Sequence, residues 1–108
     1  MEELPLINNS KINSLTILNW KNMKSISNIK ALKNLQELSL SSNLALKELP
    51  NEVFKFNTKL KKLNFNKNSI EKLYPNTLIG LDNLEEISMG DNPIIDIPQG
   101  FFSNAGQG

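Results

Sequence analysis

The chain has 108 residues, with 12 Lys and Arg against 11 Asp and Glu, and it contains neither Cys nor His. Disulfide bonds, thiolate chemistry and the Ser-His-Asp and Cys-His arrangements are therefore excluded. A net charge of +1 provides no global field that would attract nucleic acid or an anionic membrane, and no apolar run is long enough to span a bilayer. The length suits one domain.

Residues 1–11 form a lead-in to the rest of the chain. Leu4, Leu6 and Ile7 are its apolar residues, and we expect them to cover the open edge of the first structural unit. The sequence that begins at Asn8 matches the N-glycosylation pattern, a short motif that occurs often by chance. The lead-in is acidic and poor in apolar residues, so it does not resemble a signal peptide.

A nine-residue frame with apolar residues at its first, fourth and sixth positions recurs along the chain. It begins at Leu35, Leu60 and Leu84 and, in a degenerate form, at Ile12, so the period is 23 to 25 residues. Such a period is typical of a solenoid, in which each repeat buries its core against its neighbours. Alternating apolar and polar residues predict four strands, near residues 12–18, 35–41, 60–66 and 84–90.

The segment after the first strand has an apolar residue at every third position from Met23 to Leu32. This spacing favours 3₁₀ or helical turns over residues 26–34. Trp20 stands where later frames have Asn. We interpret it as an apolar plug near the N-terminal edge, with a partner-binding aromatic side chain as the alternative.

The three later frames each end in Asn, at Asn43, Asn68 and Asn92. Asn tolerates left-handed backbone angles and carries both hydrogen-bond donors and an acceptor, so it suits the turn that follows each strand. Asn57 falls where the repeat pattern places an apolar residue. We therefore expect the return segment of the second repeat to be packed more loosely than the others.

The fourth repeat continues through apolar residues that include Ile97 and Phe102, both expected to point inward. One further period would open at residue 108, where the chain has Gly instead of an apolar residue. An uncovered last repeat exposes apolar core to water. We therefore expect either a piece of a longer array or an end covered by another copy, with a lead-in at 1–11, a repeat domain at 12–105 and a tail at 106–108.

The frame LxxLxLxxN, with a period of about 24 residues, resembles the leucine-rich repeat family over residues 12 to about 105. The resemblance implies an α/β, right-handed solenoid with a parallel β-sheet on its concave face and short helical, 3₁₀ or irregular convex segments. It also implies that Asn43, Asn68 and Asn92 form a stacked ladder bonded to the backbone of adjacent repeats. Trp20 interrupts that ladder in the first repeat.

The return segments resemble the extracellular type of repeat, which has an apolar residue five positions past the last Leu, as from Leu49 to Phe54. This favours a fragment of an extracellular receptor ectodomain. The absence of cysteine caps and of a signal-like start favours a cytoplasmic protein instead. The compartment stays open between these two alternatives.

The outward positions of the predicted strands align in rows across the sheet. In the first row Lys62 stands between Glu37 and Glu86. Since neighbouring strands lie about 4.8 Å apart, we expect Lys62 to meet both carboxylates, each exposed pair contributing roughly 0–1 kcal/mol. Such a row either keeps the sheet soluble and in register or binds a polar partner. The predicted partner-binding residues of the concave face are Glu37, Ser39, Ser41, Lys62, Asn64, Asn66, Glu86, Ser88 and Asp91.

These observations favour a non-catalytic module that binds a protein or peptide on a polar concave sheet. The alternative is a structural or scaffold segment that assembles through uncapped ends with neighbouring repeats or with itself. An enzyme is not expected, because the chain has no metal-ligand or phosphate-cradling motif and the adjacent Glu85 and Glu86 would point to opposite faces of a strand. No cofactor, nucleic acid or membrane insertion is expected. The sequence names no partner and no oligomeric state.

Overall fold

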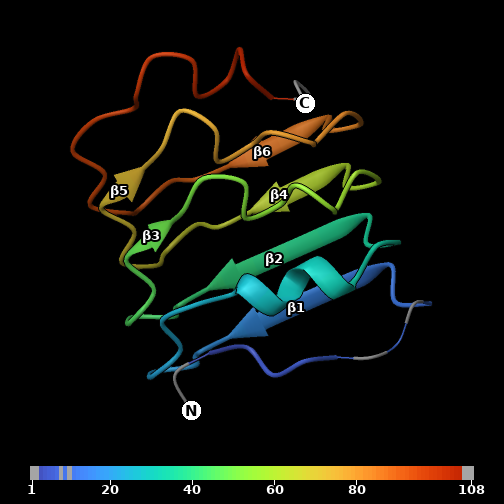
Figure 1. Cartoon of the computed structure of the whole chain (residues 1–108). Helices are drawn as coiled ribbons and strands as arrows, with labels where there is room; N and C mark the ends of the chain where they lie inside the picture. The colour runs from blue at the N-terminus through green and yellow to red at the C-terminus, as the bar shows by residue number, and fades with distance from the viewer. Residues whose placement is uncertain (1–2, 8, 10, 106–108) are drawn as a thin grey trace.

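The computed structural model describes residues 3–7, 9 and 11–105, and in this part the chain winds as a parallel β-solenoid (Figure 1). The main sheet has four strands in the order β1-β2-β4-β6, with β1 at Ser14–Leu18, β2 at Glu37–Ser41, β4 at Lys62–Asn64 and β6 at Glu86–Ser88. A second parallel sheet joins β3 (Glu48–Leu49) to β5 (Lys72–Leu73). The sequon that begins at Asn8 and the predicted tail at 106–108 lie outside the described residues.

Each main-sheet strand begins two residues later than the sequence pattern predicts. At the starts of β2, β4 and β6, two successive backbone amides share one carbonyl of the preceding repeat. The amides of Gln36 and Glu37 both donate to the Asn13 carbonyl, at 2.7 and 3.0 Å. The amides of Lys61 and Lys62 share the Gln36 carbonyl in the same way, at 2.7 and 3.1 Å. The first residue of each frame therefore packs inward before the regular ladder begins.

The strands β4 and β6 also end two residues earlier than predicted, because side chains take over the backbone bonds. The Asn66 amide donates to Oδ1 of Asn64 in its own strand, at 2.9 Å. The Gly90 amide donates to Oδ1 of Asn66 instead of to a backbone carbonyl. The prediction of four parallel strands is confirmed, and the lengths of the last two are corrected.

The first return segment forms the 3₁₀ helix η1 (Ser27–Ala31), which lies inside the predicted range 26–34 (Figure 1). The Ile29 amide donates to the Ile26 carbonyl at 2.9 Å, and the Leu32 amide donates to the Ile29 carbonyl at 3.0 Å. These i to i+3 bonds eclipse side chains three positions apart, so all three apolar residues point into the core. The 3₁₀ prediction is confirmed.

The core lies between the main sheet and the return segments. In the second and third repeats, the apolar residue five positions past the last Leu is buried, as with Phe54 and Leu78. The prediction that Phe102 fills this place in the fourth repeat is wrong, since its side chain is 50% exposed, whereas the adjacent Phe101 is 1% exposed. No described residue forms a further repeat that would cover Phe102, and Ile97 is exposed for the same reason.

Asn57 is fully buried, so the expectation of a looser second return segment is wrong. Its Nδ2 donates to the carbonyls of Ile29 and Leu32, at 2.9 and 3.1 Å. The Ile29 carbonyl lies in η1 and the Leu32 carbonyl directly after it, and each also accepts a backbone amide, from Leu32 and Leu35 respectively. The polar residue thus joins the second repeat to the first by two hydrogen bonds in the core. Its Oδ1 has no hydrogen-bond partner among the described residues.

In each turn after a main-sheet strand, the residue with left-handed backbone angles is the one directly before the last residue of the frame. The prediction that the frame-ending Asn itself adopts these angles is wrong. Ser42 has φ 59°, Lys67 has φ 60° and Asp91 has φ 57°, and Asn19 has φ 56° at the equivalent place before Trp20. The turn therefore has the same backbone in all four repeats, although its residue type differs. This backbone aims the next side chain into the core.

The lead-in covers part of the N-terminal edge, as expected for Leu4. Leu4 is buried, its amide donates to the Ser25 carbonyl at 2.9 Å, and Asn28 Nδ2 donates to its carbonyl at 2.7 Å. Leu6 is exposed, so it does not cover the edge as predicted. Trp20 is half-buried against the core, in line with the plug interpretation.

Candidate functional site

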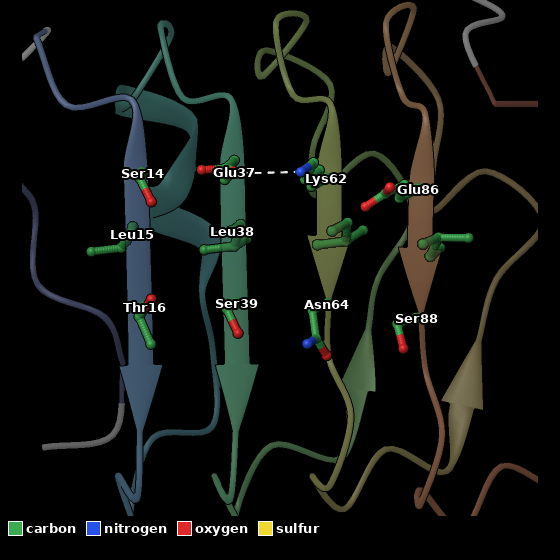
Figure 2. A pocket seen from close by; sticks show the side chains of 12 residues that line it. Ser14, Leu15, Thr16, Glu37, Leu38, Ser39, Lys62, Asn64, Glu86 and Ser88 are labelled. Carbon is green, nitrogen blue, oxygen red and sulfur yellow. Dashed lines mark ion pairs between the residues drawn. The ribbon is translucent and has the colours of Figure 1, made fainter.

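The outward-facing side of the main sheet carries two rows of polar side chains, which we call the polar sheet face (Figure 2). The strand register aligns each row across all four strands, in the arrangement that the repeat frame predicts. The first row is Ser14, Glu37, Lys62 and Glu86, and the second is Thr16, Ser39, Asn64 and Ser88. Both rows line a shallow groove of about 500 Å³. The groove crosses all four strands, so a ligand that fills it would contact every repeat.

The register follows from the repeat length. Each strand begins one turn of the solenoid after the previous one, and the shared-carbonyl start sets the same offset at every step. The one-residue insertion after Asn43 falls in the second turn, beyond β2, so it does not shift the main sheet. A shift of one residue in the pairing of the strands would move Leu38 and Leu63 out of the core. The alignment of the polar rows is therefore a consequence of the burial of these apolar residues.

The first row contains one ion pair. Nζ of Lys62 lies 3.7 Å from Oε1 of Glu37, and both side chains are about half exposed (Figure 2). No ion pair joins Lys62 to Glu86 in the part of the chain that the structure describes, so the prediction that Lys62 meets both carboxylates is wrong for Glu86. An exposed pair of this kind contributes roughly 0–1 kcal/mol. The Glu86 carboxylate therefore remains exposed at the end of the row.

The second row is neutral and partly tied together. Oδ1 of Asn66 accepts hydrogen bonds from the Ser88 hydroxyl, at 3.0 Å, and from the Gly90 amide. Asn66 therefore holds β6 against β4, and its carbonyl oxygen is occupied. The amide group of Asn64 orients the turn after β4 through its bond to the Asn66 amide. Ser39, in the middle of this row, is half-buried.

The predicted site residues separate into two groups. Glu37, Ser39, Lys62, Asn64, Glu86 and Ser88 line the groove. Ser41, Asn66 and Asp91 do not line it: Ser41 ends β2, Asn66 braces the sheet, and Asp91 lies in the last turn. The groove also contains Ser14 and Thr16, which were not predicted as binding residues. Both residues occupy outward positions of the degenerate first frame and align with the two rows. This spacing could have identified them from the sequence.

The three Asn residues at the frame ends bond from repeat to repeat. Oδ1 of Asn43 accepts from the Trp20 amide at 3.1 Å, Oδ1 of Asn68 from the Asn43 amide at 3.1 Å, and Oδ1 of Asn92 from the Asn68 amide at 3.0 Å. Each Nδ2 also donates to a strand carbonyl one repeat back; these carbonyls belong to Ile17, Leu40 and Phe65. These hydrogen bonds keep the ends of successive strands aligned, so the groove runs without a break across the sheet.

Among the described residues, no group of three or more Asp and Glu side chains is placed to hold a metal ion. Within the same residues, no helix is long and apolar enough to cross a bilayer. Glu85 and Glu86 were expected to point to opposite faces, and only Glu86 lines the groove of the polar sheet face. Both residues, with Asp82, also border a hollow of about 300 Å³ beside β6. What the polar sheet face offers is hydrogen-bonding groups and exposed charge.

Comparison with known sequences supports the interpretation of the chain as a repeat protein. A family model described as leucine rich repeat matches residues 33–94, which is more than half of the chain. The match includes the Asn43, Asn68 and Asn92 frames and all of β2, β4 and β6. No curated protein matches the chain.

Proposed function

Because the chain belongs to the leucine-rich repeat family, we propose that its polar sheet face binds a protein or peptide partner without catalysing a reaction. Domains of this fold commonly mediate protein binding and are generally not enzymes. In this proposal the polar sheet face is the concave side of a right-handed solenoid, residues 12–105 form the repeat domain, and residues 1–11 cover its first edge. Of the predicted site residues, the six that line the groove make the contacts.

The observation that carries the proposal is the alignment of polar side chains over a continuous groove. Burial of the alternate apolar residues fixes the fold, whereas the polar residues between them are exposed or half-buried and make few bonds to one another. Exposed polar positions held in register by a rigid sheet are suited to recognition, because they lose little conformational freedom when a ligand binds.

The groove favours an extended polar peptide of modest affinity. It contains hydroxyl and amide groups and no aromatic side chain, and aromatic anchors are typical of tight interfaces. The exposed Glu86 carboxylate, outside the Glu37–Lys62 pair, complements a Lys or Arg of the partner. A shallow surface with few anchors is expected to reach micromolar affinity, roughly −8 kcal/mol.

The proposal is tested by selecting ligands from a random peptide library on the immobilised chain and measuring each affinity by titration. Lys62→Glu and Asn64→Ala should weaken the selected peptides by about tenfold or more, since a contact worth about 1.4 kcal/mol changes the equilibrium constant by that factor. The peptides should also be enriched in Lys or Arg at one position.

Lys61→Glu is the matched control for Lys62→Glu. It makes the same charge change at the adjacent position, is exposed, and does not line the groove. Equal affinity of the selected peptides for Lys62→Glu, Asn64→Ala and the unaltered chain would show that binding takes place elsewhere.

A further inference from the structure

The two ends of the solenoid carry opposite charge. Residues 1–72 contain all 12 basic residues, every one of them Lys, and six of the 11 acidic residues. Residues 73–108 contain the other five acidic residues and no basic residue. The net charge of +1 is thus the sum of about +6 over residues 1–72 and about −5 over residues 73–108. The two charges are separated along the direction in which the repeats stack. Such an arrangement favours docking of unlike ends.

The C-terminal end presents an acidic rim around exposed apolar residues. The hollow beside β6 is lined by apolar residues, which include Leu84 and the half-exposed Phe102, and by the acidic residues Asp82 and Glu85. All five acidic residues of this end are exposed: Asp82, Glu85, Glu86, Asp91 and Asp96. The outer edge of β6 pairs with no other described strand. The surface therefore offers apolar area, negative charge and an open strand edge.

The N-terminal end is its complement. Lys11, Lys21, Lys24, Lys30 and Lys33 are all exposed, and residues 4–36 contain no acidic side chain. A groove of about 480 Å³ lies between the lead-in and β1, lined by apolar residues that include Ile7, Leu15 and Leu18. The outer edge of β1 is also unpaired with any described strand. In Figure 1 the first and last strands lie at opposite ends of the stack.

We propose that the C-terminal end of one chain binds the N-terminal end of a second copy, so that the solenoids stack head to tail. Apolar surface on both ends supplies the contact, and the Lys side chains of the first repeat face the carboxylates of the fourth. Like ends repel, which selects this orientation over a symmetric dimer. The Asn series does not continue across the junction, because the first repeat of the second copy has Trp20 at that position.

A contact between unlike ends does not close on itself and produces open chains of growing length. The 108-residue chain is therefore expected to increase in mean mass with concentration in light scattering at about 50 mM NaCl. Raising the salt to about 0.5 M should weaken the association about tenfold or more, because the charges are exposed. A strict monomer at millimolar concentration in low salt would overturn the proposal.

Two end-blocked variants test the orientation. Asp82→Lys with Glu85→Lys reverses the charge of the acidic end, and Lys21→Glu with Lys30→Glu reverses that of the basic end. Each variant alone should be monomeric, because its two ends then carry charge of the same sign. An equimolar mixture should associate again, because the unaltered basic end of one variant meets the unaltered acidic end of the other and the two reversed ends also complement each other. These residues lie outside the polar sheet face, so the outcome is independent of peptide binding.

Lys47→Glu with Lys61→Glu is the control for the basic end, since both side chains are exposed and lie in the middle repeats. It should associate as the unaltered chain does. Dimers of the Lys21→Glu, Lys30→Glu variant alone would indicate contact between two acidic ends, and a monomeric equimolar mixture would show that the ends do not meet. Either result would refute head-to-tail stacking.

Discussion

Replacing Asn68 by Ala tests the part that side-chain amides play in holding the repeats together. Asn68 is buried, and its Oδ1 accepts from both the amide and the Nδ2 of Asn43, at 3.1 Å each. Its Nδ2 donates to the carbonyls of Leu40 at 3.0 Å and Phe65 at 2.8 Å. The Phe65 carbonyl keeps a second donor, Asn92 Nδ2, at 2.8 Å.

The expected loss follows from the groups left without this partner. The Asn43 amide and the Leu40 carbonyl lose the bonds that Asn68 provides, and a buried polar group without a partner costs about 1–3 kcal/mol. Asn68→Ala should therefore lower the free energy of unfolding by about 2–5 kcal/mol, a large part of the roughly 5–15 kcal/mol of a typical domain.

Urea denaturation followed by circular dichroism measures this loss, with the slope m checked for two-state behaviour. Asn92→Ala is the matched control, because Asn92 is only half-buried and water can replace part of its bonds. Its cost should be about 1–2 kcal/mol. A loss below about 0.5 kcal/mol for Asn68→Ala, within the range of ordinary surface changes, would refute the reasoning, as would a larger loss for Asn92→Ala.

Two further pairs of variants test the packing. Gly80→Ala should cost about 2 kcal/mol or more in urea denaturation, because Gly80 has φ +92° and an added Cβ would lie 2.5 Å from the Lys55 carbonyl oxygen. Gly90→Ala should cost less than about 1 kcal/mol, because its Cβ would make only an ordinary contact, 3.5 Å from Oδ1 of Asn66. Equal losses would contradict this. Phe101→Ala should lower the free energy of unfolding by about 3–5 kcal/mol and Phe102→Ala by about 1 kcal/mol or less, since only Phe101 is buried. If thermal unfolding gave the reverse order, the fourth repeat would be packed differently.

The repeat frame predicted the main sheet because burial and register have one cause. Leu38 and Leu63 must point inward, so Glu37 and Lys62 must point outward and opposite each other. Any polar residue is compatible with these outward positions, and for that reason the pattern identifies the rows without identifying a partner. The second sheet was missed because β3 and β5 have two residues each, too few to show alternation.

The errors share a different cause, namely contacts that depend on a neighbouring repeat. Asn57 was expected to loosen its segment, yet its Nδ2 donates to two carbonyls of the preceding repeat, those of Ile29 and Leu32. Phe102 was expected at an inward place of the repeat, yet it is half exposed and the edge-on ring of Phe101 is its only aromatic contact among the described residues. A residue's burial in a solenoid is decided by the next repeat, which the local pattern does not contain.

Lys62 and Glu86 show the limit of arguments from spacing. The register places them opposite each other, yet the ion pair forms only between Lys62 and Glu37. Long exposed side chains choose among neighbours by small energy differences, roughly 0–1 kcal/mol, which the sequence does not reveal.

Mapping a selected peptide onto the ¹⁵N-labelled chain by chemical-shift changes tests the central claim, that the polar sheet face is the recognition surface. The account predicts that the largest changes fall on the amides of residues 14–16, 37–39, 62–64 and 86–88, which line the groove. Largest changes on η1 and the return segments, with the main sheet unaffected, would contradict it.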